Sequence, residues 1–277
     1  MPELPEVEST VRYLRERVEG HTITGATIGW ARTIHTHTPK RFVELVEGAT
    51  IGEVFRRGKF VGLELSSKSS LFLFIHLRMS GSLDVVSVEA EPSPHDRVVL
   101  LLKGGKSIRF NDTRKFGRMY LCEDPAEVVG TLGVEPLDES FSSEILCEIL
   151  RSRGGAIKPL LLNQSVIAGL GNIYVDEVLW KASIHPLTPA DTVPPEKIVR
   201  LHQAIKETLT EAISLAGTDF GDGVVYGGMY RPLVYGRDGD PCDRCQSDIE
   251  KIVVAQRGTH FCPACQKKSR RRSTRRA

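Results

Sequence analysis

Apolar side chains recur at helical spacing near the beginning of the chain, over residues 5–19. The recurring positions are Val7, Val11, Leu14 and Val18. Positions three or four residues apart fall on one face of an α-helix, so this pattern predicts an amphipathic helix with one apolar stripe. Gly20 follows the last apolar position and is a typical stop signal for a helix.

The pattern changes after this segment, and residues 22–122 contain short apolar runs of the kind that form strands. Turn signals such as "SSKSS" and "LKGGKS" separate the runs "SLFLFIHL", "RVVLLL" and "KSIRF". Several short strands at this spacing predict a β-sandwich or a barrel. Residues 122–140 have the composition of a connector, and helical periodicity then returns at about 141–152, 159–165, 172–182 and 195–216.

Composition and charge add an asymmetry to this picture. The 277 residues are 40% hydrophobic and 26% charged, as in ordinary globular proteins. The formal net charge is +2, yet the last eleven residues contribute seven positive charges, so the preceding 266 sum to −5. Such a basic tail is typical of disordered segments and is weak evidence for a polyanionic partner. Because apolar runs stay below the roughly 18 residues of a membrane span and the charged start is no signal peptide, we expect a soluble intracellular protein.

Four of the six cysteines form two C-x2-C pairs separated by sixteen residues. These cysteines are Cys242, Cys245, Cys262 and Cys265. The spacing allows all four thiolates to surround one tetrahedral zinc ion, which would be structural because four protein ligands close the coordination shell. Two disulfides are the alternative, although they are rare inside cells. The segment between the pairs predicts two strands joined by a turn at Arg257–Gly258, and Cys122 and Cys147 are predicted to be buried free thiols.

The stretch "MPELPEVE" begins the chain with acids and prolines around a candidate nucleophile. If the initiator methionine is removed, Pro2 carries a free secondary amine, and amines attack aldehydic carbons to form Schiff bases. Glu3 is adjacent as a general acid or base, and Glu6 lies one helical turn further on, where it can orient the terminus. A simple alternative is that acids gather here because the helix dipole favours them at its N-terminus.

The same stretch and several others resemble the formamidopyrimidine-DNA glycosylase family. The matching blocks, in the order of the family, are "MPELPEVE", "RRGKF", "HLRMSG", "NDTRKFG", "AIKPLLLNQSVIAGLGNIYVDEVLW", "VYGRDGDPC" and "RGTHFCPACQ". The resemblance covers the chain except the basic tail. It implies an α+β protein of two lobes: an N-terminal β-sandwich with an N-terminal helix, and a C-terminal helix–two-turns–helix lobe with a zinc β-hairpin. The active amine would lie in the cleft between the lobes.

The resemblance also implies a function and roles for individual residues. The family removes oxidised purines, chiefly 8-oxoguanine and formamidopyrimidines, and then cuts the abasic site by β,δ-elimination. Pro2 matches its Schiff-base nucleophile, Glu3 its proton donor and Lys59 a second acid. Arg257 matches an arginine that takes part in the second elimination and contacts a phosphate. The matched DNA-binding positions are Met79, His95, Arg114, Lys115, Phe116, Lys158, Asn172 and Tyr174. Met79, Arg114 and Phe116 among them correspond to the wedge that fills the gap left by the extruded base.

The implied domains are an N-terminal catalytic β-sandwich (1–122), a linker (123–140), a helix–two-turns–helix domain (141–217), a lesion-side loop (218–236), a zinc hairpin (237–266) and the tail (267–277). Implied partners are one structural Zn²⁺ and double-stranded DNA containing oxidised bases or abasic sites. We expect a monomer, located in the bacterial cytoplasm with the nucleoid, that does not bind membranes.

Two alternative functions remain open from the sequence. The first is an endonuclease VIII-like glycosylase for oxidised pyrimidines, because the lesion-side loop is shorter than the family usually has. "PELP" and the wedge residues favour the purine branch. The second is a non-catalytic zinc protein that binds damaged DNA but lacks the chemistry. Borohydride trapping of a covalent adduct distinguishes an enzyme from such a binding protein.

Overall fold

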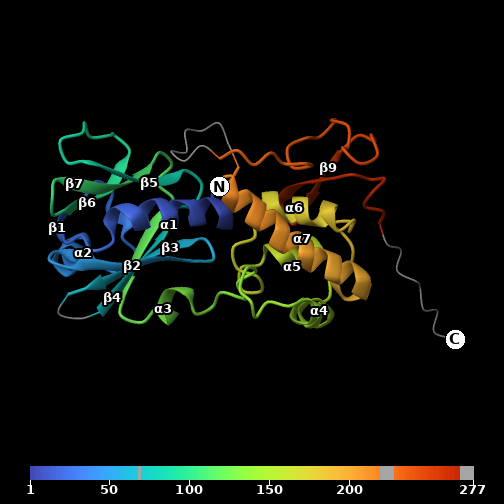
Figure 1. Cartoon of the computed structure of the whole chain (residues 1–277), viewed down its shortest axis with the longest axis horizontal. Coiled ribbons are helices and arrows are strands. Elements are labelled where there is room, and N and C mark those ends of the chain that lie inside the picture. Colours follow the sequence, from blue (N-terminus) through green and yellow to red (C-terminus); the bar gives the residue numbers. More distant parts are fainter. Residues whose placement is uncertain (68–69, 219–227, 269–277) are drawn as a thin grey trace. The chain divides into compact units, whose positions relative to one another are not determined.

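The structure, a computed structural model, describes residues 1–67, 70–218 and 228–268. The described chain forms two compact units (Figure 1). The first comprises residues 1–132 with 213–218 and 228–229, and the second comprises 133–212 with 230–268. The part of the predicted lesion-side loop at 219–227 and the tail beyond 268 lie outside the described residues.

Two four-stranded antiparallel sheets form the first unit, in the orders β1-β6-β7-β5 and β2-β3-β4-β8. The strands of the first sheet are β1 (Ile23–Ile28), β5 (Gly81–Ser87), β6 (Asp96–Leu102) and β7 (Lys106–Asp112). Those of the second are β2 (Thr50–Arg57), β3 (Phe60–Ser66), β4 (Ser70–His76) and β8 (Arg118–Cys122). Buried residues of both sheets belong to one hydrophobic core, which confirms the predicted sandwich.

The first helix, α1 (Leu4–Val18), packs against β2, β3 and β5 (Figure 1). The apolar stripe found in the sequence is its buried face: Val7, Val11 and Leu14 are fully buried. Burying several such side chains stabilises the unit by about 1.5–3 kcal/mol each, which fixes the helix on the sandwich. The predicted helix is therefore confirmed, and the residues just before it are held on a rigid support.

Some elements of this unit were absent from the sequence prediction. Helix α2 (Pro39–Val46) begins after Thr38, whose hydroxyl accepts a hydrogen bond from the amide of Arg41, and proline occupies its first turn. Strand β5 was also missed because "GSLDVVS" gives only a short alternation. Short segments η1 (Ala31–Thr33) and α3 (Ala126–Val129) complete the unit.

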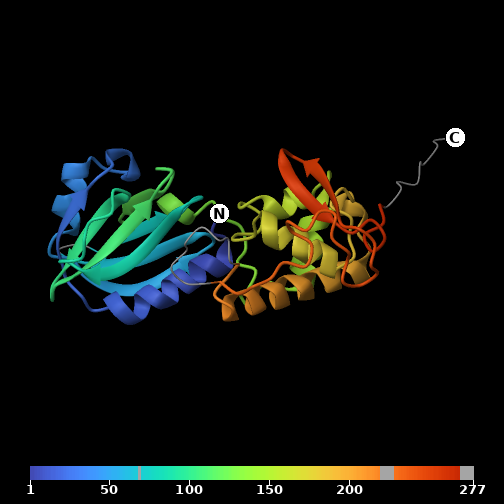
Figure 2. The same cartoon turned by 90° about the horizontal axis from the view of Figure 1, so that it is seen from above.

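The second unit contains the helices α4 (Ser143–Arg151), α5 (Ile157–Leu162), α6 (Asn172–Lys181) and most of α7 (Pro195–Ser214), with the short η2 (Ala190–Thr192). The four longer helices fall on the four helical segments expected from the sequence. Helix α6 follows the "GLG" turn and is almost entirely buried, so both its faces are packed. Helix α5 and strand β10 both pack on it (Figure 2).

The cysteine pairs flank an antiparallel hairpin of β9 (Glu250–Val254) and β10 (Arg257–Phe261). The predicted turn at Arg257–Gly258 is wrong: the turn is Ala255–Gln256, and Arg257 already pairs with Val254. Both turn residues have positive φ, 46° and 60°, as a two-residue hairpin turn of type I′ requires. The prediction placed the turn at Gly258 because glycine is common in turns, but Gly258 is a strand residue that pairs with Val253.

Candidate functional site

The N-terminal segment is held by a buried carboxylate. Pro2 and Glu3 are buried immediately before α1. The amide of Glu3 donates to Oε2 of Glu6 at 2.8 Å, and the amide of Thr218 donates to Oε1 of the same carboxylate at 2.8 Å. Glu6 thus joins the start of α1 to a residue more than two hundred positions later in the chain. This fixes the backbone that carries Pro2.

Gly217 is the residue that lets this contact form. Its φ is +86°, and a Cβ placed on it would lie 2.6 Å from Oε1 of Glu6. The backbone at Gly228 also comes close to Gly217, because a Cβ on Gly228 would lie 2.4 Å from the carbonyl oxygen of Gly217. Glycine is therefore required at 217 both for its backbone angle and for space.

Lys59 lies in the two-residue turn between β2 and β3, and only 7% of it is exposed. Gly58 precedes it with a φ of +56°. Arg56 braces the turn, since its Nη1 donates to the carbonyl of Gly58 at 3.2 Å and its Nε pairs with Glu8 of α1 at 3.1 Å. The turn that carries Lys59 is in this way tied to the helix that follows Pro2.

His76 belongs to this region, although sequence reasoning assigned it no role. It pairs across the strands with Phe60, the residue after Lys59, and their rings meet edge to face at 4.8 Å. Its Nδ1 accepts a hydrogen bond from the amide of Arg78 at 3.0 Å. Burial, aided by the charges of Arg78 and Lys59, lowers the pKa of His76 to about 3, so the ring is neutral near pH 7. The only sequence signal was its place at the head of "HLRMSG".

The three predicted wedge residues are exposed on two loops that one carboxylate connects. Met79 is 42% exposed and Phe116 is 47% exposed, while the Arg114 guanidinium lies 5.0 Å from the Phe116 ring centroid. Asp112 is buried and accepts hydrogen bonds from the Ser80 hydroxyl and from the backbone amides of Arg114 and Gly117. The structure therefore brings both loops together around Asp112.

Two more predicted DNA-binding residues lie on the same unit. Lys115 is exposed, with its ammonium 4.4 Å from the centroid of the Trp30 ring, a cation–π distance. His95 is exposed beside Arg97, and its backbone carbonyl accepts from the amide of Asp112 at 3.0 Å. Its backbone therefore borders the residue that organises the wedge loops.

In the second unit, the start of α6 holds the zinc hairpin next to Arg257. The carbonyl of Gly258 accepts from Nδ2 of Asn172 at 2.9 Å and from Nζ of Lys158 at 3.2 Å. Lys158 also pairs with Asp176 at 2.6 Å, and that carboxylate accepts from the amide of His260. Arg257 itself is exposed. The arrangement fixes the strand that begins with Arg257 while its side chain faces solvent.

Lys158 and Tyr174 differ from the other predicted DNA contacts because both are fully buried. Tyr174 packs against the ring of Tyr230 at 5.6 Å. Glu177, three residues further along α6, accepts from the backbone amides of Leu233, Val234 and Tyr235 and from the Tyr230 hydroxyl. Burial raises the pKa of Glu177, and the donated hydrogen bonds oppose that rise. These side chains hold the segment that leads to the hairpin.

The four paired cysteines converge on one centre. Their sulfur atoms all lie within 4.8 Å of one another, and Cys242 and Cys262 are buried. None of the six cysteines is in a disulfide, and the neighbouring sulfurs of Cys245 and Cys262 are 3.4 Å apart, well beyond the roughly 2.05 Å of an S–S bond. A donor set of four thiolates suits tetrahedral Zn²⁺ and leaves no position for a substrate. Cys122 is buried as predicted, whereas Cys147 is partly exposed.

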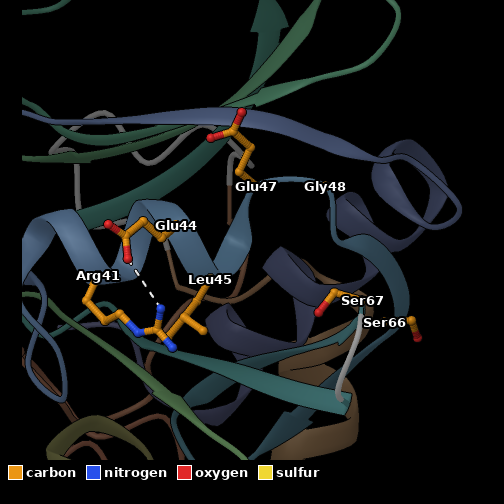
Figure 3. Close-up of a pocket in the computed structure, with 7 residues that line it drawn as sticks. All are labelled: Arg41, Glu44, Leu45, Glu47, Gly48, Ser66 and Ser67. Carbon is orange, nitrogen blue, oxygen red and sulfur yellow. Dashed lines mark hydrogen bonds and ion pairs between the residues drawn. The ribbon is translucent and has the colours of Figure 1, made fainter.

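A separate hollow of about 800 Å³ lies on the first unit beside α2 (Figure 3). Arg41 and Glu44 form an ion pair at its wall, 3.3 Å apart. The remaining lining residues are Leu45, Glu47, Gly48, Ser66 and Ser67. None of the predicted site residues lines it, so it is distinct from the candidate site.

Three family models match successive parts of the chain. Residues 1–119 match the formamidopyrimidine-DNA glycosylase N-terminal domain, and residues 132–222 match the H2TH domain of the same glycosylase. Residues 239–268 match a zinc finger found in FPG and IleRS. With the sulfur geometry, this last match confirms one structural zinc.

Curated relatives and solved structures are similar to this chain over nearly its whole length. A formamidopyrimidine-DNA glycosylase from Protochlamydia amoebophila is 43% identical over 278 residues, covering 97% of this chain and 100% of that protein. One from Chloroflexus aurantiacus is 45% identical, covering 96% and 98%. The crystal structure of Lactococcus lactis Fpg with DNA containing an abasic site has a TM-score of 0.88 at 36% identity, covering 96% and 100%. A structure of MutM with DNA containing carbocyclic 8-oxo-G gives 0.88 at 37%, with the same coverage.

An N-terminal sheet lobe, an H2TH domain and a four-cysteine zinc finger, in this order, define a DNA glycosylase with abasic-site lyase activity. The chain belongs to the formamidopyrimidine-DNA glycosylase family. The family relationship inferred from the sequence blocks is confirmed, and the alternative of a non-catalytic binding protein is set aside. None of the helices in residues 1–67, 70–218 and 228–268 is long and apolar enough to cross a lipid bilayer.

Proposed function

We propose that this chain removes oxidised purines from double-stranded DNA and then cleaves the abasic site, using Pro2 as its nucleophile. The observation that carries the proposal is the anchoring of the terminus: Pro2 is buried beside Glu3, whose amide is held by Glu6. A nucleophile is effective when its position is fixed before reaction, because orientation then costs little free energy. The capping carboxylate of Glu6 supplies this fixed position.

The proposed chemistry begins after removal of the initiator methionine. The Pro2 nitrogen attacks C1′ of the damaged nucleotide, the bond from C1′ to the base breaks, and the base leaves with a proton. Glu3 provides the nearby acid–base group for opening the sugar. Loss of a C2′ proton from the resulting Schiff base expels the 3′ phosphate, and a second elimination expels the 5′ phosphate. We assign Lys59 as an acid for these steps and Arg257 as the phosphate contact of the last one.

Base extrusion is assigned to the exposed loops around Asp112. Met79 and Phe116 offer apolar bodies that can enter the stack, and Arg114 offers hydrogen-bond donors for the unpaired base. His95 and Lys115 lie on or beside these loops and are proposed as further DNA contacts. In the second unit, Asn172, Lys158 and Tyr174 are proposed to support the phosphate-binding surface. Because Lys158 and Tyr174 are buried, their support consists of holding the hairpin and the first turn of α6.

The zinc ion would be held by the four cysteine thiolates and would supply rigidity alone. The hairpin between the cysteine pairs carries Arg257, so an intact zinc centre keeps that side chain in place. We expect a chelator that removes zinc to weaken DNA binding. Full binding by protein shown to lack the metal would contradict this role.

Borohydride trapping on abasic DNA tests the nucleophile. The wild-type protein should give a covalent adduct, and Pro2→Gly should lose most of it, because glycine lacks the ring that fixes the position of the amine. Pro39→Gly is the matched control, because Pro39 begins another helix of the same unit and should leave trapping unchanged. Mass spectrometry of the active protein must show a terminus that begins with unmodified Pro2. A retained methionine on every active molecule would exclude the proposed route.

Lesion preference is tested with duplexes that carry 8-oxoguanine, a formamidopyrimidine or an oxidised pyrimidine. We expect faster excision of both purine lesions. A structure of Lactococcus lactis Fpg with DNA containing an oxidised pyrimidine is also similar, with a TM-score of 0.88. Preferential excision of the pyrimidine would favour the endonuclease VIII-like alternative. The trapping experiment on abasic DNA would still test Pro2, because it does not depend on the damaged base.

We further propose that the enzyme acts as a monomer in the bacterial cytoplasm, in association with the nucleoid. The relatives that support this come from bacteria, and the matched structures hold Fpg or MutM with DNA. Fluorescence microscopy of a C-terminally tagged chain, compared with a DNA stain, tests the location.

A further inference from the structure

Trp180, at the end of helix α6, contacts the zinc centre directly. Its indole Nε1–H donates a hydrogen bond to Sγ of Cys242, with 3.4 Å between nitrogen and sulfur. Trp180 is 4% exposed and Cys242 is fully buried, so water does not compete for either atom. Both residues belong to one hydrophobic cluster with Val234, Ile249 and Cys262.

Arg244 covers the same indole ring. It lies between the two cysteines of the "CDRC" knuckle, and its guanidinium carbon is 3.8 Å from the ring centroid of Trp180. Its Nη1 donates to the carbonyl of Trp180 at 2.8 Å, and its Nη2 donates to the carbonyl of Lys181 at 3.2 Å. These carbonyls end α6, where peptide groups carry partial negative charge, and the carbonyl of Trp180 also accepts from the amide of Ser183 at 3.0 Å. The knuckle is therefore attached to the helix end by a hydrogen bond, a cation–π contact and a helix cap.

We propose that Trp180 is a positioning residue of the zinc site, which stabilises the Cys242 thiolate through its N–H and couples zinc retention to the end of α6. A metal-bound thiolate carries negative charge, and a buried donor aimed at the sulfur stabilises that charge. Helix α6 begins at Asn172, which also binds the hairpin through Gly258. The zinc module is thus attached to α6 at both ends of the helix.

The competing explanation is that Trp180 only fills space. Phenylalanine fills most of the same volume and preserves a ring beneath Arg244, but it has no N–H. Trp180→Phe therefore separates the hydrogen bond from most of the packing. Trp30→Phe is the matched control, because Trp30 is the other tryptophan of the chain and lies in the first unit.

Zinc release to a chromophoric chelator measures retention of the metal in the purified full-length protein. Changing an outer contact of a metal ligand typically costs about 10–100-fold in affinity, so Trp180→Phe should release zinc at least about tenfold more readily. Trp30→Phe should match the wild type. Equal release from Trp180→Phe and wild type would overturn the proposal.

Cobalt substitution supplies a readout that lost packing would not move. When Co²⁺ replaces zinc, the thiolates give charge-transfer absorption whose energy depends on the electron density at sulfur. Losing a hydrogen bond to Cys242 makes that sulfur a better electron donor, so the band should shift to longer wavelength in Trp180→Phe and stay in place in Trp30→Phe. An unshifted band would mean that the indole only packs. Borohydride trapping by zinc-loaded Trp180→Phe should remain normal, which keeps this test independent of the role of Pro2.

Discussion

The buried carboxylate of Asp112 accepts a hydrogen bond from the hydroxyl of Ser80, 32 residues earlier in the chain. The same carboxylate accepts from the amide of Gly117 at 2.7 Å. Ser80 follows Met79, and Gly117 follows Phe116. One side chain therefore sets the positions of two loops whose exposed tips are the proposed wedge.

Asp112→Asn should impair base excision while leaving the lyase chemistry intact. The amide keeps one acceptor oxygen but places an NH₂ group where a second acceptor is needed. Leaving a buried group unsatisfied costs about 1–3 kcal/mol, so excision of a damaged base should slow by about tenfold or more. Trapping on DNA that already contains an abasic site should persist, because no base must be extruded from it. Ser80→Ala removes the hydroxyl that donates to Asp112 and accepts from the amide of Arg114, but it keeps the carboxylate and its bonds to both backbone amides, so it should have a smaller effect. Excision by Asp112→Asn at the wild-type rate would contradict this role.

Gly217→Ala should reduce Schiff-base formation through displacement of Glu6. The added Cβ would lie 2.6 Å from Oε1 of that carboxylate, and the positive φ adds strain of about 1 kcal/mol. Gly20→Ala is the control, since Gly20 has a similar φ of +78° but nothing within 4 Å of the added carbon. Both variants should lose some stability, measured by urea unfolding, but Gly217→Ala alone should lose most of its borohydride trapping. Equal trapping by the two variants would show that Glu6 does not position Pro2 for Schiff-base formation.

Sequence patterns predicted the elements well where the signal was local. The stripe from Val7 to Val18 gave α1, and the cysteine spacing gave the zinc centre. The hairpin turn was misplaced because Ala255 and Gln256 adopt positive φ without glycine.

The sequence predicted that Glu6 can orient the terminus, but it could not predict the distant partner of this carboxylate. Glu6 bonds to Thr218 across 212 positions, and such a partner is fixed by tertiary packing rather than by any local pattern. The resemblance supplied candidate reactive residues, and the structure adds the long-range contacts of Glu6 and Asp112 that hold their surroundings in place.

Lys158→Met should destabilise the protein strongly, because it leaves the buried carboxylate of Asp176 without its cation. Lys158 and Asp176 are 0% and 1% exposed and lie 2.6 Å apart. Removing one partner of a buried ion pair typically costs about 3–5 kcal/mol. Chemical denaturation should show this loss. Lys181→Met is the control: its ion pair with Glu211 involves a half-exposed carboxylate, and such pairs contribute at most about 1 kcal/mol. A Lys158→Met protein of normal stability but weaker DNA binding would instead indicate a direct contact.

We expect His76 to lower the free energy of unfolding as the pH falls from 6.5 towards 3, and a variant without the imidazole should lack this loss. Its pKa is lowered from 6.5 to about 3 by burial first and then by the charges of Arg78 and Lys59. Above pH 6.5 the ring is neutral in both the folded and the unfolded chain, so its contribution is complete and constant. Between pH 6.5 and 3 the imidazole binds a proton in the unfolded chain but not in the folded chain. The free energy of unfolding therefore decreases as the pH falls, by at most about 1.4 kcal/mol per pH unit.

His76→Asn removes this titration while keeping an oxygen that can accept from the amide of Arg78. Urea unfolding of both proteins at several pH values should show the wild type losing more free energy of unfolding than the variant between pH 6.5 and 4.5. Between pH 7 and 8 the difference between the two proteins should stay constant, which serves as the internal control. Parallel curves over the whole range would show that the imidazole is equally easy to protonate in the folded and unfolded chains, and so is not shielded beside Lys59.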